Sequence, residues 1–353
     1  MQLFQQQLGW EVANVYGGEV FGADGTIRRE SEADVLLKGH VIDTLRRLNP
    51  NLPEQAYTQA YEQLNTSTST KSMVEINQEK YQFLKEGIPV TYRNQLGEVV
   101  QNHRLKMIDF DDPERNHFLA VQQLWLTGKS GRRKRPDIVG FVNGIPLVFI
   151  ELKAHHRKLR VAFEHNLTDY KDTIPRIFHF NAFILLSNGL DSKIGTITSK
   201  FTHFLDWKRI VVDQEGIVSL DTILRGTCDK GRCIDLTENY ILFDDSIGTV
   251  VKLVARNHQF IGVNKAVAHI EQLRSDFEAG KINQEDKQKL GVFWHTQGSG
   301  KSYSMAFLTQ KIHRKLSGSH TFLVVTDRKE LDKQIYGTFA GVGAVKDKAS
   351  RAK

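Results

Sequence analysis

Two carboxylates and one ammonium group stand at the ends of strand-like apolar runs between residues 135 and 156. The stretch reads RPDIVGFVNGIPLVFIELKAHH, with Asp137 before the first run and Glu151 and Lys153 at the end of the second. Side chains alternate along a strand, so Glu151 and Lys153 share a face. Neighbouring carboxylates attract a hard cation such as Mg²⁺, which lowers the pKa of a bound water and stabilises charge on a phosphate. These residue types therefore predict hydrolysis of a phosphodiester.

The connection between the two runs decides whether the three groups meet. A two-residue turn at Asn143-Gly144 would pair Asp137 with Ile150 and point Asp137 and Glu151 to opposite faces of the sheet. A three-residue loop over residues 143–145, or a bulge, pairs Asp137 with Glu151 instead. We expect the loop or the bulge, because either one lets all three groups converge.

A basic run directly precedes Asp137. Such a run is often only a solvated loop, and Lys153 or Arg135 could form a simple ion pair with Glu151 at the strand ends. Its position beside the two carboxylates favours phosphate binding instead. We predict that the following residues contact DNA: Lys129, Arg132, Arg133, Lys134 and Arg135.

A second candidate site lies in HTQGSGKS, residues 295–302. A strand is expected over 291–294, a helix over 301–316 and another strand over 321–326, which is the βαβ setting of a phosphate-binding loop. Backbone amides of Gly298, Ser299 and Gly300 can hold phosphates, Lys301 can reach the β and γ oxygens, and Ser302 can ligate Mg²⁺. His295 stands where the strict pattern has glycine, and a plain glycine-rich turn before a helix is the alternative.

The remaining sequence predicts elements of both types. Helices are expected over 31–48 (capped by Ser31), 53–64 and 161–174, and two more within 247–280. Strands are expected within 87–94, 98–110, 117–128 and 181–189, besides the hairpin. The fold class is therefore α/β, with a mixed sheet flanked by helices. The charged stretch 225–240, which contains two glycines, predicts a linker.

Composition favours a folded protein with a polyanionic partner. The 353 residues include 48 basic and 41 acidic side chains, a formal net charge of +7. Cys228 and Cys233 match no zinc or redox spacing and indicate ordinary thiols. The chain shows neither a signal peptide nor an apolar stretch of about 18 residues that could span a membrane. We expect a soluble, cytoplasmic protein.

Pro136-Asp137 followed by Glu151-Leu152-Lys153 resembles the PD-(D/E)xK nuclease signature, in the form found in type I restriction enzymes. There the motif is followed by a helix bearing QxxxY, which here reads Asn166 to Tyr170 with asparagine in the glutamine position. The resemblance implies that the nuclease residues are Asp137, Glu151, Lys153, Asn166 and Tyr170, with Mg²⁺ between the two carboxylates. Glu32 could be the extra acidic residue of such nucleases, but we prefer a carboxylate stabilised by a helix dipole.

Residues 294–302, WHTQGSGKS, resemble the motor motif of type I restriction subunits, which belong to helicase superfamily 2. ARNHQFIGVNKAV, 255–267, resembles the segment that reads adenine through a glutamine, here Gln259. VVTDRKELDKQ, 324–334, resembles the next motor motif, with Asp327 and Arg328 near the path of DNA. The resemblance implies ATP and Mg²⁺ as cofactors of this region.

Together these motifs resemble the N-terminal part of the restriction (R) subunit of type I restriction-modification enzymes. The implied organisation is a restriction-endonuclease-like domain over 1–230, a linker over 231–250, and the start of a RecA-like lobe over 251–353. We expect this lobe to be only partly contained in residues 251–353, because no Asp-Glu box, second lobe or arginine finger is found there. The implied activity is Mg²⁺-dependent cleavage of unmodified double-stranded DNA, coupled to ATP-driven translocation and performed with methylation (M) and specificity (S) subunits.

Two other functions fit part of the pattern. A nuclease-helicase of DNA repair would use the same two modules without a specificity partner. A nucleotide-gated DNA-binding module would keep the fold but have an inactive nuclease site.

Overall fold

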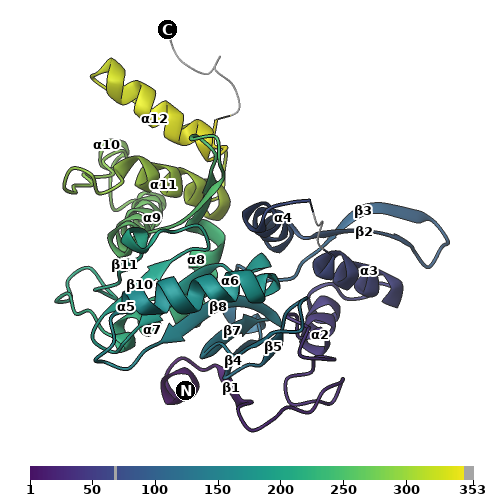
Figure 1. The fold of residues 1–353 in the computed structure, drawn as a ribbon. Helices are drawn as coiled ribbons and strands as arrows, with labels where there is room; N and C mark the ends of the chain where they lie inside the picture. Colours follow the sequence, from purple (N-terminus) through teal and green to yellow (C-terminus); the bar gives the residue numbers. More distant parts are fainter. Residues whose placement is uncertain (67–69, 346–353) are drawn as a thin grey trace. The chain divides into compact units, whose positions relative to one another are not determined.

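The computed structural model describes residues 1–66 and 70–345, and it divides into two compact units (Figure 1). Unit 1 comprises Met1–Lys208 and Ile217–Glu238, and unit 2 comprises Arg209–Gly216 and the residues from Asn239 onward. The last eight residues of the predicted motor region, 346–353, lie outside the described part.

Unit 1 is built on a mixed sheet that, among the described residues, has seven strands in the order β1-β4-β7-β8-β9-β10-β11. β8 lies in the middle, antiparallel to β7 and parallel to β9, and β1 is parallel to β4. The mixed α/β architecture predicted from the sequence is confirmed. The strands are β1 (Glu11–Asn14), β4 (Phe118–Gln122), β7 (Ile138–Val142), β8 (Ile145–Leu152), β9 (Phe183–Ser187), β10 (Ser192–Gly195) and β11 (Leu205–Asp206).

Helices and short ribbons surround this sheet (Figure 1). The π segment η2 packs against β8, and α7 packs against β10. The helical elements of unit 1 are α1 (Gln2–Gln6), α2 (Lys38–Leu48), α3 (Glu54–Asn65), α4 (Met73–Glu86), η1 (Pro113–Arg115), α5 (Leu159–Val161), η2 (Ala162–Leu167), α6 (Thr168–Thr173), η3 (Pro175–His179), η4 (Phe201–His203), α7 (Leu220–Cys228) and α8 (Lys230–Asn239), whose last residue belongs to unit 2. Two separate ribbons pair β2 (Ile88–Arg93) with β3 (Val99–Leu105) and β5 (Leu126–Thr127) with β6 (Arg133–Lys134).

In unit 1 the structure corrects one helix prediction and adds one helix. The helix expected over 31–48 begins only at Lys38, and Ser31 instead accepts and donates hydrogen bonds within a local turn that includes Asp34. α4 was not predicted, although its capping box is visible in the sequence: Ser72 accepts from the Glu75 amide while the Glu75 carboxylate accepts from the Ser72 amide.

The β7–β8 hairpin combines a two-residue turn with a bulge. Val142 pairs with Ile145 around Asn143-Gly144, whose φ angles of 54° and 79° are left-handed and suit a tight hairpin turn. Farther along, Gly140 pairs with Val148 and Phe141 with Pro146, so Leu147 has no partner across the ladder. Of the two expected forms, the loop or the bulge, the structure has the bulge and a two-residue turn. The bulge supplies the same one-residue shift and puts Asp137 opposite Glu151.

The linker predicted over 225–240 and 231–250 has regular structure, and the boundary between the two units, after Glu238, falls inside both ranges. These residues form the end of α7, then α8 (Lys230–Asn239) and β12 (Ile241–Asp244). Cys228, Cys233 and Ile234 are fully buried. Charged residues lie between these apolar ones, which gives the helices an apolar face. Burying this face stabilises the folded chain, whereas a flexible linker would leave it exposed to water.

Unit 2 contains the β12–β13 hairpin, with β13 at Val251–Val254, and a set of helices. These are α9 (Asn257–Glu278), α10 (Gln284–Lys287), α11 (Lys301–Lys315) and α12 (Lys329–Gly341). Of the two helices predicted within 247–280, the first is wrong and is replaced by β13. The second corresponds to α9.

The strands predicted over 291–294 and 321–326 are not formed, and these residues take no regular structure. Val292, Trp294, Leu323 and Val325 are between 79% and 93% exposed. A buried parallel strand needs hydrogen-bonded neighbours on both sides, and the described part of the chain offers these segments none. The helix between them, α11, is present as predicted.

No helix within residues 1–66 and 70–345 has both the length and the apolar composition that crossing a membrane requires.

Candidate active site and nucleotide loop

Glu151 occupies the centre of the first candidate site. It is the next-to-last residue of β8 and only 1% exposed. Its Oε1 accepts hydrogen bonds from Lys153 Nζ and Asn166 Nδ2, each at 2.6 Å. Burial first, and then repulsion by Asp137, raises the pKa of Glu151 to about 7, against a smaller lowering effect of Lys153. The site therefore holds a carboxyl group that ionises near neutral pH.

Asp137 immediately precedes β7 and is held by two donors. Its Oδ1 accepts from Gln123 Nε2 at 3.0 Å and its Oδ2 from the Leu152 amide at 2.8 Å. The second bond links Asp137 to the residue after Glu151, so the two carboxylates lie on neighbouring strands at one end of the hairpin. Gln123 was not selected from the sequence. It follows β4 with a left-handed φ of 58°, and no motif marks it.

Asn166 reaches Glu151 from a π-helical segment. η2, over Ala162–Leu167, has the wider i→i+5 pattern between the short α5 and α6. The helix predicted over 161–174 is thus present, with a π segment at the position of the asparagine. Such segments occur frequently at functional sites. Here the segment carries the shorter asparagine arm to within 2.6 Å of the carboxylate.

Tyr170 lies one turn beyond Asn166 and is buried. Its ring packs edge-on to Phe149 at a centroid distance of 5.6 Å, and its hydroxyl donates to the Arg135 carbonyl at 3.4 Å. The hydroxyl also helps to lower the pKa of Glu151. Burial raises the pKa of Tyr170 above its ordinary value, so the phenol stays protonated. The structure therefore brings together all five residues predicted for the nuclease site.

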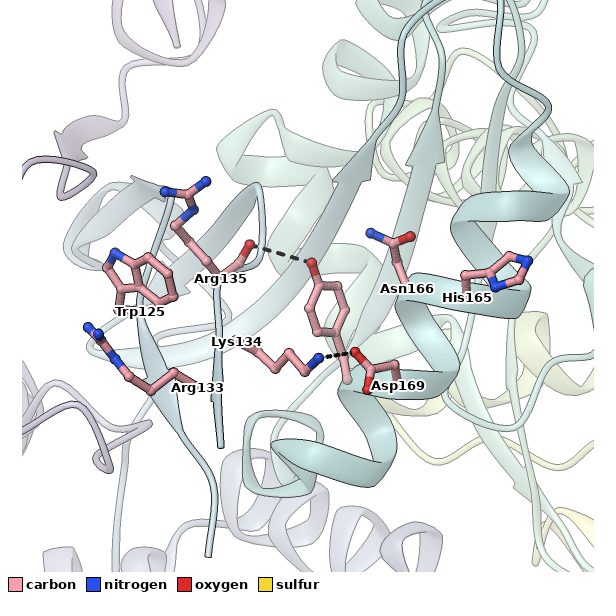
Figure 2. Close-up of a pocket in the computed structure, with 8 residues that line it drawn as sticks. Trp125, Arg133, Lys134, Arg135, His165, Asn166 and Asp169 are labelled. Atoms are coloured by element: carbon pink, nitrogen blue, oxygen red, sulfur yellow. Dashed lines mark hydrogen bonds and ion pairs between the residues drawn. The ribbon is translucent and has the colours of Figure 1, made fainter. Parts of the chain in front are cut away.

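A pocket of about 340 Å³ opens beside these residues (Figure 2). On one side lie Trp125, Arg133 and Arg135, and on the other lie His165, Asn166 and Asp169. Its full lining is Trp125, Arg133, Lys134, Arg135, His165, Asn166, Asp169 and Tyr170. The pocket thus joins the basic run to the helix that contacts Glu151.

The members of the basic run have different surroundings. Arg133 forms an ion pair with Glu32 through two hydrogen bonds, and Lys134 forms an ion pair with Asp169. Lys129 and Arg132 are exposed near the β5–β6 turn, where Arg132 donates to the Ser130 hydroxyl. Two of the five predicted DNA contacts are therefore already neutralised within the chain.

Glu32 does not have the predicted role at a helix N-terminus. It lies outside any helix and binds Arg133 and the Thr127 hydroxyl, and the hydrogen bond from Arg133 is the main reason that its pKa is lowered. The helix-dipole hypothesis depended on a helix starting at Ser31. That helix starts seven residues later.

The donor set of the site fits a magnesium ion. Glu151 Oε2 is buried and accepts no hydrogen bond from the described residues, so one carboxylate oxygen is free for a cation. Within that part of the chain no three His, Cys, Asp or Glu side chains form a metal cage. Mg²⁺ commonly binds through one or two carboxylates and keeps its other waters, and Asp137 with Glu151 meet that requirement.

The predicted nucleotide loop, which precedes α11, is closed by hydrogen bonds between its own residues. Gly298 and Gly300 have left-handed φ angles of 76° and 84°, and Gly300 caps the helix. Lys301 Nζ donates to the carbonyls of His295 and Thr296 at 2.8 and 3.2 Å. Phosphate binding would require Lys301 to leave these carbonyls. Ser302, the predicted metal ligand, is the second residue of α11.

Residues at the start of α9 hold this loop. Gln259 Nε2 donates to the Gly300 carbonyl at 2.9 Å, and Gln259 Oε1 accepts from the Arg256 amide at 2.8 Å. His258 contacts the Ser299 carbonyl at 3.0 Å. Gln259 is therefore buried against the loop it was predicted to serve, and its contact with adenine stays a prediction.

Comparison with known families agrees with these features. Residues 1–203 match the model of the type I restriction enzyme R protein N terminus, and residues 258–353 match that of the SWI2/SNF2 ATPase. The first match covers more than half of the chain. The chain therefore belongs to the family of type I restriction enzyme R subunits and corresponds to their N-terminal part.

Curated relatives show the same relationship. The chain is 34% identical to the type I restriction enzyme HindI endonuclease subunit of Haemophilus influenzae over 95% of its own length and 31% of the relative's. It is 29% identical to the putative type I restriction enzyme MjaIXP endonuclease subunit of Methanocaldococcus jannaschii, over 91% of the chain and 32% of that relative. The chain thus spans about a third of the length of these relatives.

Proposed function

We propose that unit 1 has a restriction-endonuclease-like fold and cleaves double-stranded DNA with Mg²⁺ held by Asp137 and Glu151. The observation that carries this proposal is the bulged hairpin. It places Glu151, with a free buried oxygen, opposite Asp137 and within 2.6 Å of Lys153. A surface ion pair between Lys153 and Glu151 would need neither the burial nor the second carboxylate.

Each residue then has a definite task. Mg²⁺, when bound, lowers the pKa of a coordinated water and stabilises charge on the phosphate. Lys153 offers its ammonium group beside Glu151, where it can orient the attacking water and stabilise the negative charge that forms as one P–O bond replaces another. Asn166 and Tyr170 keep Glu151 in place, and Gln123 does the same for Asp137.

Unit 2 contributes the start of a RecA-like ATPase lobe in this proposal. The SWI2/SNF2 match and the loop at Gly298–Ser302 support ATP·Mg²⁺ binding there, with Lys301 on the phosphates and Ser302 on the metal. The relatives' names support a place in a type I restriction enzyme. The whole protein would then cleave unmodified DNA in the cytoplasm, translocate it with ATP, and act with methylation (M) and specificity (S) subunits.

Metal binding and cleavage should be measured together on the 353-residue chain. Calorimetric titration at about pH 8, where Glu151 is ionised, should show Mg²⁺ or Mn²⁺ binding that is lost in Asp137→Ala. Nicking of supercoiled plasmid should require the same metal and disappear in both Asp137→Ala and Lys153→Ala. Asp206→Asn removes a half-exposed carboxylate of β11 that binds Lys193 and serves as the matched control.

The proposal makes metal binding and cleavage depend on the same carboxylates. Metal binding with full affinity in Asp137→Ala would show that the cation site lies elsewhere. Metal-dependent nicking that survives Lys153→Ala would show that the lysine is only structural. Metal binding without any cleavage by the wild type would favour the alternative of a DNA-binding module with an inactive site.

A further inference from the structure

Arg135 differs from the other members of the basic run in lying against two aromatic rings. Its guanidinium carbon lies 4.6 Å from the centre of the Tyr16 ring and 4.9 Å from that of Trp125. Across residues 1–66 and 70–345 it forms no ion pair with a carboxylate. Aromatic faces attract a cation and fix its direction, but they leave its N–H donors available.

The neighbouring cations show the contrast. Arg133 is paired with the carboxylate of Glu32, and Lys134 is paired with the carboxylate of Asp169. Arg133 also stacks on Trp125, at 4.4 Å, so the same indole is shared by a neutralised and an unneutralised arginine. An anion that enters here would gain most from Arg135, because binding Arg133 or Lys134 would mean competing with a carboxylate.

The position of Arg135 connects it to the candidate nuclease site. It lies two residues before Asp137, and its carbonyl accepts the Tyr170 hydroxyl bond. It lines the same pocket as Asn166 (Figure 2), and the Asn166 amide donates directly to Glu151. The pocket is therefore continuous with the residues that would surround the phosphate to be cut.

We infer that Arg135, oriented by Tyr16 and Trp125, binds a backbone phosphate of the DNA that is adjacent to the phosphate at which the strand is cut. The planar guanidinium can donate two parallel hydrogen bonds to two phosphate oxygens, which a lysine ammonium cannot reproduce. The inference rests on the proposed nuclease function and adds to it a positioning residue for the substrate. Free phosphate or a mononucleotide offers the same oxygens, so the experiment has to separate these ligands from duplex DNA.

The experiment uses the 353-residue chain and a fluorescent duplex of about 20 base pairs, with Ca²⁺ in place of Mg²⁺ to prevent cleavage. Arg135→Ala should weaken binding by about tenfold or more, because a charged hydrogen-bonding group is lost. It should also reduce the slope of log affinity against log salt by about 1. Arg135→Lys should keep that slope while still losing affinity. Arg115→Ala, an exposed arginine paired with Asp109, is the matched control.

The aromatic contacts provide a second measurement. Tyr16→Phe should leave binding unchanged, whereas Tyr16→Leu should weaken it without altering the salt slope, since the charge remains and only its orientation is lost. Circular dichroism of each variant would verify that the fold is intact.

The outcomes separate this inference from the nuclease proposal. If Asp137→Ala abolishes cleavage while Arg135→Ala binds and cuts DNA like the wild type, the inference is wrong and the nuclease proposal stands. If Arg135→Ala loses binding of inorganic phosphate or a mononucleotide but not of duplex DNA, the site takes a free anion and the inference is again wrong. If the wild type neither cleaves nor binds duplex DNA, the nuclease proposal itself fails.

Discussion

Glu151→Gln should change how the stability of unit 1 depends on pH. Glu151 has a pKa of about 7 in the folded chain against the usual 4.5, and burial is the main cause. Between these values the folded chain binds a proton that the unfolded chain does not. The contribution of this proton to the free energy of unfolding is complete below pH 4.5 and is lost as the pH rises through 7. At about 1.4 kcal/mol per pKa unit, the loss amounts to about 3 kcal/mol.

The assay is urea unfolding in EDTA at about pH 5 and about pH 8, followed by hydrogen exchange of the β8 peptides to restrict the readout to unit 1. Burial lowers the pKa values of His40 and His179 to about 4, so these groups raise the stability of unit 1 as the pH rises, and they do so equally in both chains. The Glu151 effect is therefore read as a difference: between about pH 5 and about pH 8 the wild type should lose about 3 kcal/mol of stability relative to Glu151→Gln, because glutamine has the same shape and no charge. Asp206→Asn, a half-exposed carboxylate on the edge strand, should behave like the wild type.

Added Mg²⁺ gives an internal check of the same reasoning. The metal binds the ionised carboxylate, so it should restore the wild type at about pH 8 and leave Glu151→Gln unaffected. Equal pH dependence in the wild type and in Glu151→Gln would refute the explanation, since the shifted carboxyl would then lie elsewhere.

Three further predictions concern other parts of the chain. Ser72→Ala removes the α4 cap and should lower the free energy of unfolding by about 1 kcal/mol in urea titrations, whereas Ser130→Ala in an exposed turn should have little effect; equal stability of the two variants would mean that the cap is not stabilising. Lys301→Ala should reduce binding of a fluorescent ATP analogue, with Lys315→Ala as the control at the other end of α11, and unchanged affinity would show that the loop does not hold phosphates. Cys228 and Cys233 should react with thiol reagents only on unfolding, because burial raises the pKa of Cys228 to about 12 and the pKa of Cys233 also rises; rapid labelling of the native chain would contradict their buried positions.

The site residues could be predicted from the sequence because their types and order carry the chemistry. How Asp137 and Glu151 come to face each other could not. β8 is apolar from Ile145 to Ile150, so no side chain marks the bulge at Leu147. Gln123 was missed for a similar reason, since nothing in its neighbourhood distinguishes a glutamine that binds a carboxylate from one that is solvated.

Other errors had signals that were overlooked. The capping box of α4 is explicit in Ser72 and Glu75, and the apolar spacing in 225–240 is compatible with a helix. The segments 291–294 and 321–326 are a different case. Their apolar composition favours strands, but a strand forms only against neighbouring strands, and the local sequence holds no information about those neighbours.

The bulge has a consequence for how the register of β8 at the candidate site is fixed. β7 and β8 are apolar and buried on both faces, so the alternation of polar and apolar side chains does not mark their register. Apolar character alone therefore does not decide whether Glu151 or Ile150 lies at the candidate site. A few polar contacts favour the observed register. The buried Asn143 side chain accepts a hydrogen bond from the His117 amide and donates one to the Met107 carbonyl, and the Leu152 amide donates to Asp137. A chain that lost these anchors would lack the polar contacts that keep Glu151 opposite Asp137.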